Sequence, residues 1–404
     1  MKKKHTVLFV DDEQSALDGF RTMMHSVRKE VKCFFASGGQ EGLELLQKQS
    51  VDVVIADMRM PGMDGAEFLS RVTRLYPGTI RIVLSGYSDN PSLFKSTRVA
   101  HQFLTKPCNS EKIIETIRKV TALNDVFVNE NVRKTVAKLD SLPVLPDRLA
   151  DLSAELDSPD PNLKRISQLV ELDTGMSTTL MKVANSSFFG FFENVTTPSR
   201  AVTLLGSETV RGLVLREHLI DKIDLTGLEN YSVEKLWQHT LETGYCAKAI
   251  ATHEKADKKF IDSCFLAGIL HDVGKLALLT KMKDVYEPVL ECVREEDGPI
   301  RKCELKKLNV DHAMVGAYLL GLWGFKEDIV KGVFLHHRPQ HGGKGLTVPL
   351  VVHVANTLQH ETREFTSDGY AHSSLNTFWL AEQGLNRRVD DWRAACIEKW
   401  SAND

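Results

Sequence analysis

The first 120 residues alternate apolar segments of strand length with segments of helical period, and they do so five times. Each apolar segment is a short run bounded by turn residues, which is typical of a strand buried on both faces of a parallel sheet. The five segments are residues 6–10, 31–36, 51–56, 80–84 and 102–105. Five strand–helix repeats of this length predict an α/β doubly wound (βα)5 sheet. From residue 139 onward the pattern is helical almost throughout, so we predict a multidomain chain whose second part is all-α.

Residues able to bind cations and phosphoryl groups follow four of these segments. They are Asp11 and Asp12, Asp57, Ser85 and Lys106. The carboxyl ends of parallel strands meet at one edge of a sheet, so we expect these side chains to lie together. Three carboxylates repel each other unless a cation lies among them, and oxygen ligands of this kind suit Mg²⁺. Taken alone, Asp57 could instead cap the next helix, but the five residues in this order favour a phosphoryl site.

This pattern resembles the receiver domain of two-component response regulators over residues 6–120. The resemblance implies that Asp57 accepts a phosphoryl group from a sensor histidine kinase, which makes the protein a signalling phosphoprotein. It also implies that Mg²⁺ is held by Asp11, Asp12 and Asp57 together with the backbone carbonyl of Arg59. We therefore place a receiver domain at residues 1–120.

The resemblance also implies how phosphorylation is sensed. Lys106 is expected to contact the acyl phosphate, and Ser85 and Phe103 are expected to form the switch pair. Ser85 moves toward the phosphoryl group, Phe103 follows, and the surface of the fourth and fifth helices changes its partners.

Residues 110–139 are predicted to form one long helical connector, continuous with the last helix of the receiver domain. Apolar residues recur in it at spacings of three or four, and no glycine or proline interrupts it. Two interpretations remain open. The helix is a solvated link between two bodies, or it pairs with its copy in a homodimer, with Asn124 or Asn131 setting the register. We predict the homodimer.

Histidines gather in the helical part of the chain, and one of them is followed directly by an aspartate. The residues are His239, His271 with Asp272, His312, and His336 with His337. A single histidine on a helix is usually an ordinary core residue. Several of them together with a carboxylate favour a pocket for a transition metal instead.

The segments 184–186 and 204–206 resemble the HDOD domain, and the His271-Asp272 pair resembles the HD superfamily of phosphohydrolases. We place the HDOD domain at residues 140–358. In active HD enzymes a first histidine, the His-Asp pair and a later aspartate hold the metal, and His239, His271 and Asp272 match the first three. Three further histidines resemble the added ligands of the cyclic-di-GMP-cleaving HD-GYP branch, namely His312, His336 and His337.

Two departures from the active enzymes decide the expected function. Asn356 stands where the later aspartate is expected, and the Gly-Tyr-Pro signature is absent after His337. A neutral amide is the weaker ligand, so the metal site is degenerate. HDOD domains are regarded as non-catalytic, so we predict an output that acts through a protein or a signalling ligand and has no catalytic residues. The alternative is a metal-dependent HD phosphohydrolase or cyclic-di-GMP phosphodiesterase.

Composition restricts the remaining possibilities. The net charge is only −3 and is evenly spread, so we predict no nucleic-acid partner. No apolar run of 18 residues and no signal peptide is seen, so we expect a cytoplasmic protein without a membrane partner. The seven cysteines form no CxxC pairs, and we expect reduced thiols. Residues 359–404 are expected to form a helical extension to which the sequence assigns no chemistry.

Overall fold

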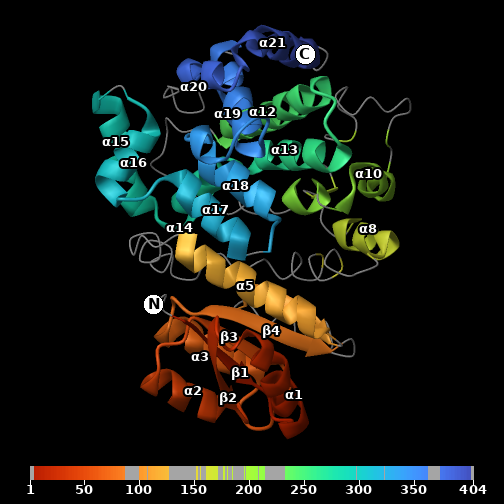
Figure 1. Ribbon diagram of the computed structural model, residues 1–404, viewed down its shortest axis with the longest axis vertical. Helices are drawn as coiled ribbons and strands as arrows, with labels where there is room; N and C mark the ends of the chain where they lie inside the picture. The colour runs from red at the N-terminus through yellow and green to blue at the C-terminus, as the bar shows by residue number, and fades with distance from the viewer. Residues whose placement is uncertain are drawn as a thin grey trace. The chain divides into compact units, whose positions relative to one another are not determined.

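The protein is described from a computed structural model (Figure 1). It describes residues 4–86, 100–106, 108–126, 161–171, 197–207, 209–213, 233–296, 298–322, 324–362 and 374–401, with positions 152, 155, 176–177, 180, 184 and 195. The chain divides into two compact units, Met1–Asp157 with Leu319–Gly324 and Ser158–Tyr318 with Phe325–Asp404. Each unit is considered by itself.

The first unit contains a five-stranded sheet in which every neighbouring pair is parallel, in the order β2-β1-β3-β4-β5. The strands are β1 (His5–Val10), β2 (Val31–Ala36), β3 (Val53–Asp57), β4 (Ile80–Gly86) and β5 (Gln102–Lys106). The helices are α1 (Gln14–Met24), the 3-10 turn η1 (His25–Val27), α2 (Gly39–Lys48), α3 (Gly65–Leu75) and α5 (Ser110–Val126). Figure 1 shows α5 across the sheet from α2 and α3. The predicted doubly wound α/β architecture is confirmed.

The central strand β3 and helix α3 show why these segments adopt this fold. All five residues of β3 are buried, as expected for a strand covered on both faces. Helix α3 buries Phe68, Leu69 and Val72 on one face, and the Asp64 side chain caps its start by accepting the backbone N–H of Glu67. Gly65 is needed here, because a Cβ at this position would overlap the backbone oxygen of Asp57.

Helix α5 covers the first part of the predicted connector. It runs from Ser110 to Val126 and buries Ile113, Ile117 and Val120, which confirms the apolar spacing over that range. Residues 127–139 lie outside the described residues. The continuous helix to residue 139 and the pairing of two copies therefore stay predictions.

The second unit is helical throughout the residues that the structure describes, which confirms the predicted all-α class. Its helices are α8 (Leu163–Glu171), α10 (Pro198–Leu205), α12 (Val233–His253), α13 (Lys258–Leu270), α14 (Val273–Lys281), α15 (Lys283–Glu296), α16 (Ile300–Leu308), α17 (His312–Leu322), α18 (Glu327–Leu335), α19 (Val348–Thr362), α20 (Thr377–Glu382) and α21 (Val389–Ser401). Short 3-10 turns lie at Pro339–His341 and Asn386–Arg388. Helix α12 is central, since it contacts α13, α19 and α21.

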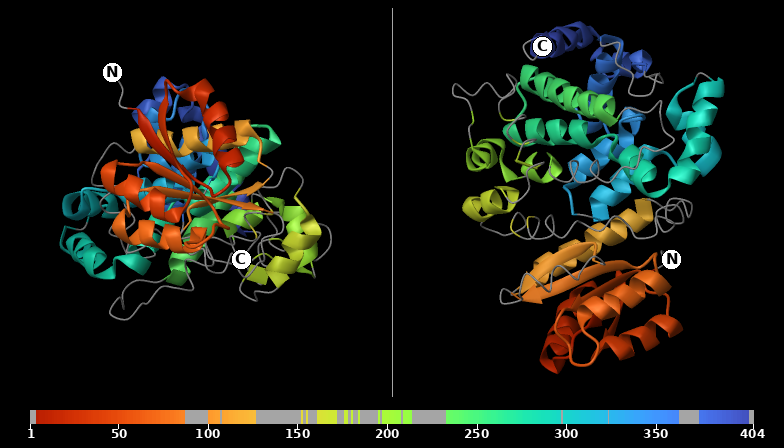
Figure 2. Two further views of the ribbon diagram at one scale, coloured as in Figure 1. Left: turned by 90° about the horizontal axis from the view of Figure 1, so that it is seen from below. Right: turned by 180° about the vertical axis from the view of Figure 1, so that it is seen from behind.

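Two glycine contacts bring the helices of this unit unusually close. Helices α12 and α13 lie side by side (Figure 2), and a Cβ on Gly268 would be only 2.7 Å from the Cα of Gly244. Helices α14 and α17 meet in the same way, because a Cβ on Gly274 would overlap the backbone oxygen of His312. Glycine alone permits these backbone approaches, which set the spacing of the helices that carry the histidines.

Helix α21 belongs to the helical unit. The buried Trp392 donates its indole N–H at 2.7 Å to Glu254, which directly follows α12, and a disulfide joins Cys396 to Cys246 of α12. A second disulfide joins Cys292 of α15 to Cys303 of α16. The expectation of seven reduced thiols is therefore wrong for these four residues, because packing pairs cysteines from different helices. Cys33, Cys108 and Cys264 are free.

Within the described residues, no single helix has both the length and the apolar character needed to cross a membrane. One bent pair, Lys258–Leu279 with Lys283–Glu296, meets that test by length and composition.

Candidate functional sites: an acidic sheet edge and a buried histidine cluster

The register of the sheet brings two aspartates to the same level. Val10 of β1 pairs with Ala56 of β3, so Asp11 and Asp57 leave their strands side by side. Both are buried, whereas Asp12 is exposed. Lys106, at the end of β5, donates to Asp11 Oδ2 at 3.0 Å and also to Asp57 Oδ1. We call Asp11, Asp12, Asp57 and Lys106 the acidic edge.

Backbone amides hold the two buried carboxylates in place. The N–H of Arg59 donates to Asp57 Oδ2 at 2.8 Å, and the N–H of Glu13 donates to Asp11 Oδ1 at 3.0 Å. Each carboxylate thus has one oxygen bound to the backbone and the other bound to Lys106.

The electrostatics of this edge favour a cation and an incoming anion. Burial opposes the charge on Lys106, but its hydrogen bonds to Asp57 and Asp11 outweigh that effect and raise the pKa of the ammonium. Lys106 therefore stays charged and can neutralise a phosphoryl oxygen as it arrives. Asp11, Asp57 and the exposed Asp12 supply hard oxygen ligands, so the donor set fits Mg²⁺.

The other residues predicted for this site are located by their backbone only. Ser85 lies on β4, the strand next to β3, and pairs with Thr105, whereas Phe103 lies on β5 and pairs with Val83. The side chains of Ser85 and Phe103 lie outside what the structure describes, and the switch pair stays a prediction. So does the role of the Arg59 carbonyl as a magnesium ligand.

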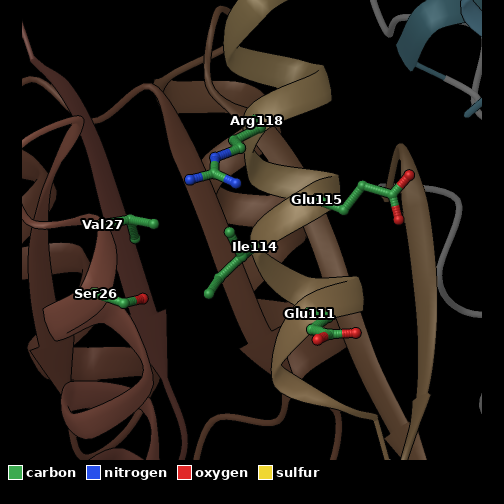
Figure 3. A pocket seen from close by; sticks show the side chains of 6 residues that line it. All are labelled: Ser26, Val27, Glu111, Ile114, Glu115 and Arg118. Atoms are coloured by element: carbon green, nitrogen blue, oxygen red, sulfur yellow. The ribbon is translucent and has the colours of Figure 1, made fainter.

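A cavity of about 280 Å³ lies elsewhere on the first unit, between η1 and α5. Figure 3 shows Ile114 and Arg118 of α5 pointing toward Ser26 and Val27. Arg118 also forms two hydrogen bonds with the Glu30 carboxylate, at 2.8 and 2.9 Å. No residue of the acidic edge lines this cavity, so the two sites are separate.

The second unit brings together all six of the predicted histidine-cluster residues from different helices. They form two groups, each with ligand atoms within 4.8 Å of one another. The first triad is His239 of α12 with His271 and Asp272, which lie between α13 and α14. The second triad is His312, which begins α17, with His336 and His337, which follow α18. All are buried except His337, which is half-buried.

Asp272 lies between the two triads and faces both of them. Its Oδ1 is 3.2 Å from His312 Nε2 in the second triad. Its Oδ2 is 3.4 Å from His271 Nε2 and 3.7 Å from His239 Nε2. Lys275 also donates to Oδ2, at 2.8 Å. One carboxylate therefore offers an oxygen to each triad.

Hydrogen bonds on the far side of the rings determine which nitrogen carries the proton. The Nδ1–H of His271 donates to the Gly268 carbonyl, and that of His336 donates to the Val333 carbonyl, both at 2.7 Å. The Nδ1–H of His239 donates to Gln359 Oε1 at 2.6 Å, and that of His312 donates to Glu304 at 2.7 Å. In the neutral ring, Nε2 is then an unprotonated lone pair in each case.

These lone pairs converge. His239 Nε2 is 3.1 Å from His271 Nε2, and His312 Nε2 is 3.0 Å from His337 Nε2. Burial lowers the pKa of His239 well below the usual range, so no proton is available there at neutral pH. Two facing lone pairs repel unless a cation lies between them. Adjacent ligands about 2.1 Å from one metal ion are about 3 Å apart, so the spacing fits a transition metal.

The charge state of the cluster agrees with this. Burial lowers the pKa of His336 and His337, which keeps both rings neutral. Burial opposes the charge of Asp272, but nearby His271 and Lys275 outweigh it and hold the pKa well below the usual range. Burial also opposes a charge on His312, but the Glu304 carboxylate outweighs that effect and raises the pKa of the ring. Imidazoles together with one carboxylate are a donor set that suits Zn²⁺, Mn²⁺ or Fe²⁺.

Two family models match the chain, and each covers one of these two sites. One family model, the response regulator receiver domain, matches residues 7–118, and a second, the HDOD domain, matches residues 142–339. The chain joins a receiver domain to an HDOD domain. The receiver match supports a response-regulator role for this chain.

Relatives resemble one part of the chain at a time. An uncharacterized protein of Treponema pallidum is 25% identical over 230 residues, which are 56% of this chain and 44% of the relative. The hydrogenase transcriptional regulatory protein HoxA of Cupriavidus necator is 36% identical over 119 residues, 29% of this chain and 24% of the relative. The chain thus spans less than half the length of these two relatives. A crystal structure of an HDOD domain protein with unknown function from Geobacter sulfurreducens covers 67% of this chain and 97% of that one, at 21% identity and a TM-score of 0.49.

Helix α19 of the second unit carries Asn356, which the sequence analysis singled out, and two histidines near the cluster that it did not. Asn356 is buried, and its Oδ1 has no hydrogen-bond partner in the described part of the chain. His353, three residues earlier, donates to the His336 carbonyl at 2.8 Å. His360, four residues later, stacks on His239 with ring centroids 4.4 Å apart, and burial lowers its pKa to about 4. Positions 353, 356 and 360 share one helical face, so Asn356 lies on the face toward the triads.

The other unforeseen residues hold the histidine rings in orientation. Gln359 binds His239, and Glu304 binds His312. In the sequence, these two residues could be found only by their distance from predicted ligands. Gln359 lies three residues after Asn356, and Glu304 lies eight residues before His312.

Proposed function

We propose that this chain is a response regulator that is phosphorylated on Asp57 and thereby controls a non-catalytic HDOD output with transition metal bound at its two triads. The output acts in the cytoplasm by binding a protein or a signalling ligand, and the chain works as a homodimer. Its receiver domain extends over residues 1–120 and its HDOD domain over 140–358, with a connector at 110–139 and an extension at 359–404.

Phosphoryl transfer at the acidic edge follows from the contacts of Asp57. A carboxylate oxygen of Asp57 forms a P–O bond while the P–N bond of the phosphorylated kinase histidine breaks. Mg²⁺ held by Asp11, Asp12, Asp57 and the Arg59 carbonyl would neutralise the transferring oxygens. Lys106 already bridges Asp11 and Asp57, so it is placed to exchange a carboxylate for the acyl phosphate.

The metal proposal is supported above all by the facing Nε2 atoms of His239 and His271. Each ring donates its Nδ1–H to an oxygen behind it, so in the neutral rings neither Nε2 can donate to the other. The unpartnered Nε2 of His336 and Oδ1 of Asn356 add two donor atoms without a hydrogen on them. Metal bound at the two triads would give the facing Nε2 atoms a partner.

Metal content tests this proposal directly. We expect the purified full-length protein to hold about two transition-metal ions per chain, one at each triad. His239→Ala should lose at least half of that metal, as measured by mass spectrometry of the released ions. The matched control is His253→Ala, which removes an exposed histidine from the same helix. Equal metal content in the parent and in His239→Ala would count against the site.

A second candidate is hydrolysis of a phosphodiester such as cyclic-di-GMP. The observation in its favour is that the two oxygens of Asp272 face different triads, as a carboxylate bridging two catalytic metals does. Neutral Asn356 and the burial of the ligand atoms favour the non-catalytic output.

Turnover decides between the two outputs. We expect no release of linear dinucleotide when Mn²⁺ or Fe²⁺ and cyclic-di-GMP are supplied to the parent protein. Release that is lost in His271→Ala would establish the hydrolase and overturn our first choice.

A further inference from the structure

Behind the second triad lies a buried chain of three polar side chains from three helices. Tyr286 of α15 donates its hydroxyl to Glu304 Oε1 at 2.6 Å. Glu304 of α16 accepts both the ring Nδ1–H and the backbone N–H of His312, at 2.7 and 3.0 Å. Tyr286, Glu304 and His312 are fully buried. Figure 1 shows α15 and α16 beside each other near α17.

Burying a carboxylate away from water costs free energy unless hydrogen bonds compensate for it. Glu304 receives three donors, and two of them come from His312. Its position at the first N–H of α17 also places the negative charge at the positive end of that helix. Holding one residue by ring and backbone together fixes both the rotation of the His312 ring and its tautomer. The Nε2 of His312 is thereby directed toward Asp272 and His337.

The first triad is supported differently. His239 Nδ1 is held by Gln359, a neutral amide. The Glu242 carboxylate lies one hydrogen bond further away, where it accepts from Gln359 Nε2 at 3.0 Å. His271 and His336 are held by backbone carbonyls. Of the four triad histidines with a described Nδ1 partner, only His312 has a carboxylate there. A carboxylate on the far nitrogen makes an imidazole a stronger ligand.

We propose that Glu304, supported by Tyr286, is a positioning residue that orients His312 and makes the second triad the tighter of two metal half-sites. This inference rests on the proposed metal site. The first triad binds more weakly because its histidine supports are neutral and because Asn356 adds no charge. Metal therefore fills the second triad first.

Titration of the metal-free full-length protein with Co²⁺ tests the order and the residue. We expect two phases in the visible absorption, and Glu304→Gln should weaken the tighter phase by about 10- to 100-fold. Glu242→Gln, the matched control, makes the same change behind the first triad and should leave the tighter phase within about 3-fold of the parent. Tyr286→Phe keeps the Glu304 charge and should weaken the tighter phase by a smaller factor, about 3- to 10-fold.

The outcomes separate the two proposals. A parent protein that takes up no Co²⁺ overturns the metal site itself. If the parent takes up Co²⁺ normally, two results overturn the role of Glu304 alone. One is an unchanged Co²⁺ affinity of the tighter phase in Glu304→Gln, and the other is a larger loss of that affinity in Glu242→Gln. Should Glu304→Gln fail to fold by circular dichroism, Tyr286→Phe decides, and an unchanged tighter phase in that variant overturns the inference.

Discussion

Asp57→Asn should reduce phosphorylation of the receiver domain by a small donor such as acetyl phosphate to background, a loss of more than about 100-fold. An amide oxygen is a far weaker nucleophile than a carboxylate oxygen. The change also places an amide NH₂ against either Lys106 or the Arg59 N–H, both of which are donors. Intact-mass spectrometry of the protein with Mg²⁺ and donor measures the phosphorylated fraction.

Asp64→Asn is the matched control for this experiment. Asp64 lies seven residues further along the same loop, where its side chain caps α3, and asparagine caps a helix as well as aspartate does. It should be phosphorylated like the parent protein. Phosphorylation that persists in Asp57→Asn would show that another residue is the acceptor.

Asn356→Asp should change stability in opposite directions without and with metal. Without metal, a new carboxylate replaces a buried amide whose oxygen has no described hydrogen-bond partner, at a cost of about 3 to 5 kcal/mol. We expect the melting temperature to fall by roughly 10 °C. With Zn²⁺ or Mn²⁺ present, the carboxylate gains a cation, so the melting temperature should recover and metal affinity should rise by more than about 10-fold.

Thermal melts of the metal-free and metal-loaded forms measure both effects. Asn376→Asp is the control, because Asn376 caps α20 and tolerates the same substitution there. Its melting temperature should be unchanged in both conditions. A loss of stability in Asn356→Asp that metal does not reverse would mean that position 356 is outside the metal site.

The acidic edge was predictable because its geometry follows from local pattern and one general rule. Apolar runs identify the strands, and parallel strands end at one edge, so Asp11, Asp57 and Lys106 had to meet there. The register of β1 and β3 added that Asp11 and Asp57 leave the sheet at the same level.

The histidine cluster was predictable in composition but not in arrangement. Its six ligand residues come from α12, α17 and the ends of α13 and α18. They are separated by up to about a hundred residues, and no local sequence pattern specifies how the helices between them pack. Close glycine contacts, such as Gly244 with Gly268, decide how near those helices come. The cysteines illustrate the same point, because Cys246 and Cys396 are 150 residues apart and their spacing does not predict a disulfide.

Local pattern thus determined the strands, the helices and the chemical identity of both sites, since these depend on residues near each other in the chain. Tertiary structure decided the proton positions and the support of each ligand. Asp272 faces two triads, Gln359 holds His239 and Glu304 holds His312 only because helices distant in sequence pack together. That packing sets the hydrogen-bond partner of each side chain and therefore its affinity for a metal.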